Sequence, residues 1–211
     1  MASYSRDERA ALADLMTAVG PDAPTLCGGW STRDLAAHLV VREHRPDLAA
    51  AAVVPGLRGR SEQARVEIRD GTAWPELLDR LRAGAPAWSP MGNPLTESAV
   101  NLLEFFVHHE DVRRAQAGWG PRAVPSPLED ELWRRLPVIG ALSTRRWTAG
   151  LTLTSFGGRS LRLRRGEPMV RVSGSPSELV LFCTGRQRVA RVDTDGPAAV
   201  LEALDAAPFG I

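Results

Sequence analysis

The chain has 211 residues, 44% of them hydrophobic and 24% charged, which is enough for one large or two small globular domains with a real core. Its formal net charge of +1 gives no general attraction to nucleic acid or to anionic membranes. The sequence contains only 2 cysteines, which excludes a disulfide scaffold and favours a reducing compartment.

The first two thirds of the chain have the apolar spacing of helices. Ser5 can cap a helix over 5–19, and after a loop rich in Pro, Gly and Thr a second helix begins at Ser31 and ends near residue 45. Asp34 stands three residues after Ser31, in a capping-box position. Later helices are predicted over 48–54, 60–69, 74–81, 96–117 and 126–145.

The pattern changes near Trp147. Alternating residues predict strands over 151–154, 160–164 and 169–172, with turns between them. Ser175, Pro176 and Glu178 are typical of a helix start, and this helix should end at Gly185. A strand over 189–192 and a helix over 197–204 complete the chain. The predicted fold is therefore α+β: a metal-binding helical bundle over 1–146, then a small α+β domain over 147–211.

Three side chains on two predicted helices suggest a metal centre. Glu104 and His108 are four residues apart on one helix, which leaves them roughly 40° apart on the same face. His38 comes from the second helix and supplies another imidazole. One carboxylate and two imidazoles make a three-ligand site for a divalent metal, and three protein ligands leave a coordination position open, as in catalytic sites.

A chance pairing of Glu and His on a solvated helix is the competing interpretation. Both segments argue against it, because Glu104 and His108 lie among leucine, phenylalanine and valine, and His38 among leucine, alanine and valine. Ionisable groups in such apolar surroundings are rarely buried unless they are paired or bound to a metal.

The segments Trp30-Ser31-x-x-Asp34-x-x-x-His38-Leu39 and Glu104-x-x-x-His108-x-x-Asp111 resemble the DinB-like metal-binding four-helix bundles. They are most similar to the mycothiol-dependent maleylpyruvate isomerase branch, and segment 174–186 resembles the sterol-carrier-like C-terminal domain that follows the bundle there. The resemblance implies a divalent metal, usually zinc, held by His38, Glu104 and His108, and often a low-molecular-weight thiol as cosubstrate. It does not fix the reaction.

Several functions fit such a site. A metal-bound thiol is deprotonated and nucleophilic, so we expect a thiol-using transferase or isomerase, with mycothiol as the candidate thiol and a small electrophile as substrate. A non-catalytic metal- or ligand-binding protein is the alternative, and a metal-dependent hydrolase that activates water is the third. Arg186 is the candidate group for the carboxylate of the thiol or of an anionic substrate, together with the hairpin arginines Arg159, Arg162, Arg164 and Arg165. For the hairpin arginines a solvated face is the simpler interpretation.

Other polar residues have structural interpretations that we weigh beside functional ones. Asp111 either orients His108 or pairs with Arg114. His109 should point about 100° away from His108 and is not expected to be a ligand. His44 is expected to be exposed. Cys27 precedes the helix of His38, either as a small buried residue or as a group that approaches the metal.

The sequence also indicates where the protein works. The first residues are polar and lack the apolar core of a signal peptide, and the apolar stretches are too short to cross a bilayer. We therefore expect a cytoplasmic protein with small-molecule partners and neither nucleic acid nor membrane. All its basic residues are arginine, which suggests a GC-rich, bacterial coding sequence.

Overall fold

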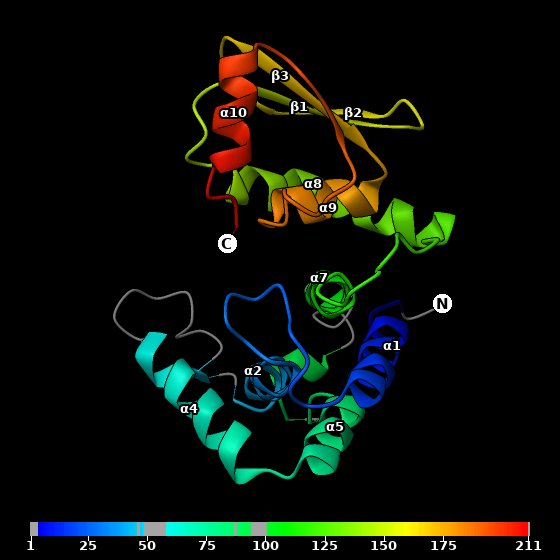
Figure 1. The fold of residues 1–211 in the computed structure, drawn as a ribbon, viewed down its shortest axis with the longest axis vertical. Helices are drawn as coiled ribbons and strands as arrows, with labels where there is room; N and C mark the ends of the chain where they lie inside the picture. Colours follow the sequence, from blue (N-terminus) through cyan, green and yellow to red (C-terminus); the bar gives the residue numbers. More distant parts are fainter. Residues whose placement is uncertain (1–3, 46, 49–57, 87, 94–100, 211) are drawn as a thin grey trace. The chain divides into compact units, whose positions relative to one another are not determined.

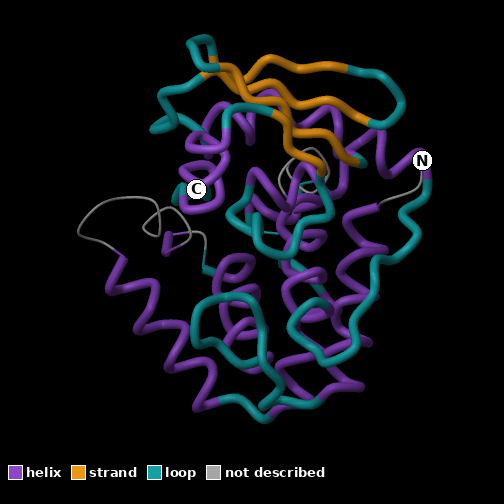
Figure 2. The backbone as a smooth tube through the Cα atoms, turned by 45° about the horizontal axis from the view of Figure 1, so that its top comes forward, coloured by secondary structure: helices purple, strands orange, loops and turns teal. Residues whose placement is uncertain are grey.

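The computed structural model describes residues 4–45, 47–48, 58–86, 88–93 and 101–210. The chain forms two compact units, Met1–Gly120 and Pro121–Ile211. Within the described ranges the first unit is built from helices and loops, and all four strands belong to the second (Figure 2). The fold is α+β, as the sequence predicts. The division lies after Gly120, whereas the sequence pattern placed it after residue 146.

In the described part of the first unit, Figure 1 shows the helices α1 (Tyr4–Val19), α2 (Thr32–His44), α4 (Arg58–Gly71), α5 (Trp74–Ala83) and α7 (Leu102–Arg113), with a 3-10 turn, η1, at Pro90–Gly92. Each α-helix corresponds to a predicted helix, whereas η1 lies in a segment that was expected to be a loop. Of the predicted helix over 48–54, residues 49–54 lie outside the described part of the chain, as do residues 96–100 of the helix that carries Glu104.

α7 ends at Arg113 instead of the predicted residue 117. The reason is a side chain that replaces a backbone donor. The side-chain nitrogen of Gln116, Nε2, donates to the carbonyl of Val112 at 2.8 Å and to that of Pro24 at 3.0 Å. The Val112 carbonyl therefore has a hydrogen-bond donor without a further helical turn. This contact also holds the loop before α2 against the end of α7.

The core of the first unit is formed by one apolar face from each of four helices, α1, α2, α5 and α7. Its fully buried side chains include Leu12, Met16, Leu35, Leu39, Leu77, Leu81, Phe105 and Val112. Within each helix these residues lie four or seven positions apart, which places them on one side of the helix. α1 packs against α7, and α2 against α4 and α5. The packing fixes the helices that carry the predicted metal ligands.

The start of α2 is held by a complete capping box. The Asp34 carboxylate accepts from the Ser31 amide at 3.0 Å, and Ser31 Oγ accepts from the Asp34 amide at 3.3 Å. The same carboxylate pairs with Arg65 and, at 3.1 Å, with Arg69 of α4. Burial opposes ionisation, but these hydrogen bonds lower the pKa of Asp34 to about 2. Asp34 is therefore a structural carboxylate, as predicted.

The second unit is a four-stranded sheet with two helices, α8 (Ser126–Ser143) and α9 (Pro176–Cys183), on one side (Figure 1). The strand order is β2 (Ser160–Arg164), β1 (Gly150–Ser155), β3 (Met169–Gly174) and β4 (Asp193–Asp195). β1 pairs antiparallel with β2 and parallel with β3, and β4 is antiparallel to β3. A last helix, α10, spans Ala198–Ala206.

The predicted strand over 189–192 is wrong. Val189 and Ala190 donate instead to the Arg186 carbonyl in a turn, and the Arg191 amide donates to Glu178 at 2.7 Å. Because these donors are used within the turn and on α9, the ladder to β3 begins only at Asp193.

α8 belongs with the sheet because its apolar face is buried there. Leu128, Leu132 and Leu136 are at most 3% exposed, and the helix packs against α9 and β2. Polar contacts add to this packing: Arg159 donates to Asp130 at 2.8 Å, and Arg164 donates to the Thr144 carbonyl at 2.8 Å. Two of the hairpin arginines thus tie β2 and its turn to α8. Among the described helices, none is long and apolar enough to cross a membrane.

The first prediction concerns the capping carboxylate. Because the folded-state pKa of Asp34 lies at about 2, below its ordinary 3.8, its stabilisation is complete above pH 3.8 and is lost as pH falls through about 2. Asp34→Asn should lower the free energy of unfolding at neutral pH by about 1 to 2 kcal/mol. The variant should also lose less stability than the wild type on acidification, measured by urea unfolding. Asp22→Asn, at an exposed loop position, is the matched control, and equal acid sensitivity of Asp34→Asn and wild type would contradict the assignment.

Candidate metal centre

The structure brings the three predicted ligands together where α2 meets α7. His38 comes from the middle of α2, and Glu104 and His108 from successive turns of α7. Glu104 Oε1 lies 3.3 Å from His38 Nε2 and 3.2 Å from His108 Nε2. The three donor atoms all lie within 4.8 Å of one another. One carboxylate oxygen therefore faces two imidazole nitrogens.

The spacing of these donors suits a small divalent cation. Zinc bonds to N and O of about 2.0–2.2 Å, arranged tetrahedrally, separate neighbouring donors by about 3.3–3.5 Å. The distances from Glu104 Oε1 to His38 Nε2 and His108 Nε2, 3.3 and 3.2 Å, are close to that separation. Side chains of His38 and Glu104 keep about a quarter of their surface, 28% and 25%, exposed to solvent. The residues present thus fit a metal ion with access for a further ligand.

Glu104 is oriented by an arginine that the sequence analysis did not single out. Arg42 Nε lies 3.5 Å from Glu104 Oε2, and Arg42 Nη1 donates to Asn101 Oδ1 at 2.7 Å. Burial alone would raise the pKa of Glu104, but the Arg42 charge and the contacts with both imidazoles hold it well below its ordinary value. The carboxylate is therefore ionised, with one oxygen directed to the arginine and the other to the histidines.

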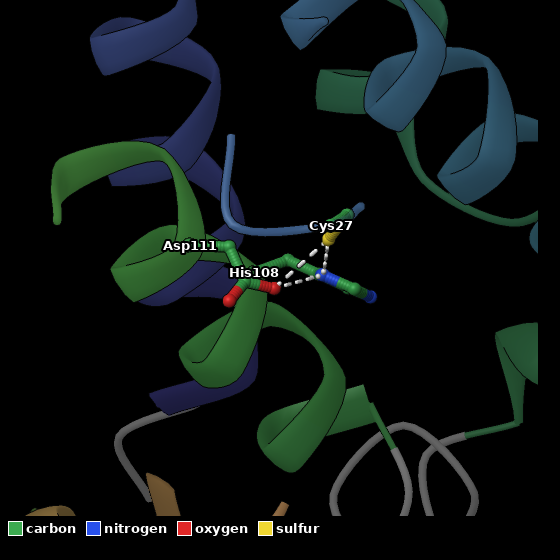
Figure 3. A group of neighbouring side chains, drawn as sticks. All are labelled: Cys27, His108 and Asp111. Atoms are coloured by element: carbon green, nitrogen blue, oxygen red, sulfur yellow. Dashed lines mark hydrogen bonds and ion pairs between the residues drawn. The ribbon is translucent and has the colours of Figure 1, made fainter. Parts of the chain in front are cut away.

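His108 is held from the opposite side of its ring. Its Nδ1 lies 2.9 Å from Asp111 Oδ2 and 3.6 Å from Cys27 Sγ, and the Cys27 thiol is 3.1 Å from the same carboxylate oxygen. Burial would lower the pKa of His108, but hydrogen bonds with Asp111, the Cys27 thiol and Glu104 hold it well above its ordinary value. Figure 3 shows Nδ1 directed at both partners, while the second ring nitrogen points away from them.

These contacts support the predicted role of Asp111 as the residue that orients His108. Its side chain is fully buried and faces His108, so it orients the imidazole. Arg114 also forms an ion pair with Glu110, at 2.6 Å. Cys27 does approach the site, but at the ring nitrogen opposite to the one that faces Glu104.

His38 is positioned by ring packing. The Trp30 and His38 ring centroids are 5.2 Å apart, and the Arg65 guanidinium lies 4.8 Å from the Trp30 ring centroid. Trp30 thus contacts both an arginine and a predicted ligand. The loop before α2 therefore supports both imidazoles, His38 through Trp30 and His108 through Cys27.

The other histidines lie apart from this group. His109 pairs with Glu8 of α1 at 2.9 Å in the core, as expected for a residue that is not a ligand. The expectation that His44 is exposed is wrong. It is half-buried, its Nε2 has no hydrogen-bond partner, and burial followed by the Arg80 charge lowers its pKa. The His44 ring is covered by the backbone at Gly84, where α5 ends beside the end of α2.

Arg186 lies in the second unit, just after α9. Its guanidinium donates to the Thr184 carbonyl. Arg159 and Arg164 are engaged with α8, whereas Arg162 and Arg165 are exposed. A role for any of these arginines in binding an anion stays a prediction.

Sequence reasoning missed Arg42 and Arg65, although a signal existed for the first. Arg42 follows His38 by four residues and so shares its helix face. Arg65 left no such signal, because it reaches Trp30 from a helix distant in sequence.

Comparisons with known proteins give a consistent picture. Residues 5–113, more than half of the chain, match the family model described as the mycothiol maleylpyruvate isomerase N-terminal domain. The crystal structure of the mycothiol-dependent maleylpyruvate isomerase is similar to this chain with a TM-score of 0.59 and 18% sequence identity, covering 91% of this chain and 90% of that one. A histidine-to-alanine mutant of that isomerase gives a TM-score of 0.57 at the same identity and coverage. These likenesses show a shared fold. No curated protein sequence matches the chain.

The second prediction concerns metal content. Purified protein should retain about one divalent ion per chain, because three donors that lie within 4.8 Å of one another can fill most of a tetrahedral site. His38→Ala should weaken zinc binding strongly and His108→Ala should abolish it, as measured by elemental analysis after dialysis. His109→Ala is the matched control, since this neighbouring buried imidazole faces Glu8 instead. Equal metal loss from His109→Ala and His108→Ala would mean that the metal is lost through helix damage and would contradict the assignment.

Proposed function

The chain belongs to the mycothiol maleylpyruvate isomerase N-terminal domain family, and from this membership and the geometry of the site we propose that it is a metal-dependent, thiol-using isomerase or transferase. The metal is proposed to be zinc, the thiol mycothiol, and the substrate a small electrophile. The observation that carries the proposal is the convergence of two imidazole nitrogens on one carboxylate oxygen, at 3.2 and 3.3 Å.

The donor set supports a catalytic rather than a structural metal. His38, Glu104 and His108 would hold the ion, and three protein ligands leave a position for an exogenous one. When bound there, a divalent cation favours the thiolate form of a coordinated thiol. The thiolate is the form that attacks an electrophilic carbon or adds to an activated double bond.

The surrounding residues set the state of each ligand. Arg42 keeps the Glu104 carboxylate ionised and turns one oxygen away from the histidines. Asp111 lies at His108 Nδ1, so it favours the tautomer that has the proton on Nδ1 and the lone pair on Nε2. Trp30 restricts the tilt of the His38 ring by packing against it. Together these contacts hold the three donor atoms in position before a ligand binds.

The position of Cys27 supports an open coordination site. A fourth protein ligand would fill the metal and leave no place for a thiol. Cys27 Sγ lies 3.6 Å from His108 Nδ1, on the side of the ring that faces away from Glu104. The thiol of this cysteine is thus directed away from the nitrogen that would bind the ion, which favours an external thiol as the reacting group.

Arg186 stays the proposed partner for an anionic group of the substrate or of the thiol. A guanidinium is suited to this task because its planar fork can donate two parallel hydrogen bonds to a carboxylate. Arg188 is two residues away and exposed, and so provides a matched arginine for comparison.

The third prediction separates an enzyme of this kind from a binding protein without a reaction. Calorimetric titration with mycothiol should show binding to the zinc-loaded protein and a large loss of affinity after a chelator removes the metal, because the thiolate needs the cation. Arg186→Ala should weaken productive binding by about tenfold, a value typical of a lost charge-assisted hydrogen bond. Arg186→Lys should restore only part of it, and Arg188→Ala should behave as the wild type.

Two results would refute this function. One is mycothiol binding of equal strength with and without metal. The other is a zinc-loaded protein that binds mycothiol but shows no thiol-dependent conversion of maleylpyruvate or related unsaturated acids, in which case the non-catalytic binding protein becomes the better account.

A further inference from the structure

A second cluster of donors lies on the other side of the His108 ring. Cys27 Sγ, His108 Nδ1 and Asp111 Oδ2 all lie within 4.8 Å of one another and come from the loop before α2 and from α7 (Figure 3). Asp111 is fully buried, and Cys27 and His108 are half-buried. The cluster contains one sulfur, one nitrogen and one oxygen donor.

The separations within this cluster also suit a cation. Sγ and Nδ1 are 3.6 Å apart, Sγ and Oδ2 3.1 Å, and Nδ1 and Oδ2 2.9 Å. Tetrahedral bonds of about 2.3 Å to sulfur and 2.0–2.1 Å to nitrogen and oxygen would separate these donors by about 3.3–3.6 Å. For an ion of the size of zinc, one distance already matches and the other two need to widen by about half an ångström or less. A larger cation with longer bonds requires all three distances to widen further, by rotation of the side chains.

The backbone holds the cysteine in place for this arrangement. The Leu26 amide donates to the Asp111 backbone carbonyl at 3.1 Å, which fixes the loop on α7 one residue before the thiol. The Cys27 amide donates to Thr25 Oγ1 at 3.2 Å. On the other side of the thiol, the Trp30 amide donates to the Cys27 carbonyl at 2.8 Å. The thiol thus faces His108 from a loop held on both sides, so little ordering is required when a cation binds.

The two donor sets share one imidazole on its opposite nitrogens. A neutral imidazole has a lone pair on one nitrogen and a proton on the other, so it serves one cation at a time. Occupation of the Cys27 side therefore removes His108 from the side that faces Glu104.

The chemistry of the donors differs between the sets. His38, Glu104 and His108 supply nitrogen and oxygen only, whereas the second set includes a thiolate, which selects soft metals. We propose that Cys27, His108 through Nδ1, and Asp111 form an alternative binding site for a thiophilic cation such as Cd²⁺. Such a cation competes with zinc for His108 and so inhibits the site that faces Glu104.

The fourth prediction tests this site with cadmium alone, on the full chain. Metal-free protein titrated with Cd²⁺ should develop a thiolate-to-cadmium charge-transfer absorption band in the ultraviolet. The chain has only 2 cysteines, so the sulfur can be assigned. Cys27→Ser should lose the band. Cys183→Ala should keep it, because Cys183 is fully buried in α9, where burial raises the pKa of its thiol to about 12.

The variant His38→Ala tests whether the two donor sets are separate sites. If the second set is separate, this variant keeps the cadmium band although its zinc binding is weakened. Loss of the band in His38→Ala would mean that Cys27 belongs to the same centre as His38, and would overturn the proposal. Absence of a band in the wild type, or its persistence in Cys27→Ser, would also overturn it. Circular dichroism and thermal unfolding check that each variant is folded.

The outcome is independent of the proposed enzyme function. Cys183→Ala, which lies outside both donor sets, should bind zinc and, when loaded with zinc, mycothiol as the wild type does. A protein that binds zinc but no mycothiol refutes the proposed function and leaves the cadmium result standing. A protein with metal-dependent mycothiol binding but no cadmium band refutes only this inference.

Discussion

The first unit depends on one constraint, a half-buried carboxylate that faces two imidazoles. Glu104 Oε1 lies within 3.3 Å of both His38 and His108, and an ionised group at such a depth is stable only when positive charge compensates it. Arg42 provides part of that charge, and a divalent cation would provide more. For the three side chains to meet, α2 and α7 must keep a fixed separation, which the shared core with α1 and α5 maintains.

Each ligand is supported in a different way, and one loop serves two of them. Arg42 holds Glu104 by charge, Asp111 holds His108 by a hydrogen bond, and Trp30 restrains His38 by ring packing. Trp30 and Cys27 both come from the loop before α2. That loop is tied to α7 and to the capping box at Ser31. A change in the conformation of this loop would therefore displace both imidazoles. A loop that is held in this way keeps the geometry of the site fixed before a ligand binds.

Local periodicity was enough to place Glu104 and His108 on one face of a helix, because helix geometry fixes which residues share a face. His38 lies on a different helix, and its place beside them was suggested by the resemblance of the sequence motifs, not by periodicity. Periodicity also located most helices and three of the strands. Features that depend on distant partners were missed. α8 joins the sheet because its leucines meet α9, β4 begins late because Glu178 takes a backbone donor, and His44 is covered by the end of α5. Contacts of this kind join segments that are distant in sequence, so the local sequence pattern does not predict them.

X-ray absorption at the zinc edge of the zinc-loaded protein tests the central claim most directly. The account predicts a first shell of nitrogen and oxygen only, at about 2.0–2.2 Å, with the multiple-scattering pattern of two imidazoles. A sulfur neighbour at about 2.3 Å would show that zinc is bound by Cys27 instead. A shell without imidazole scattering would remove His38 and His108 from the site, and either result would contradict the account.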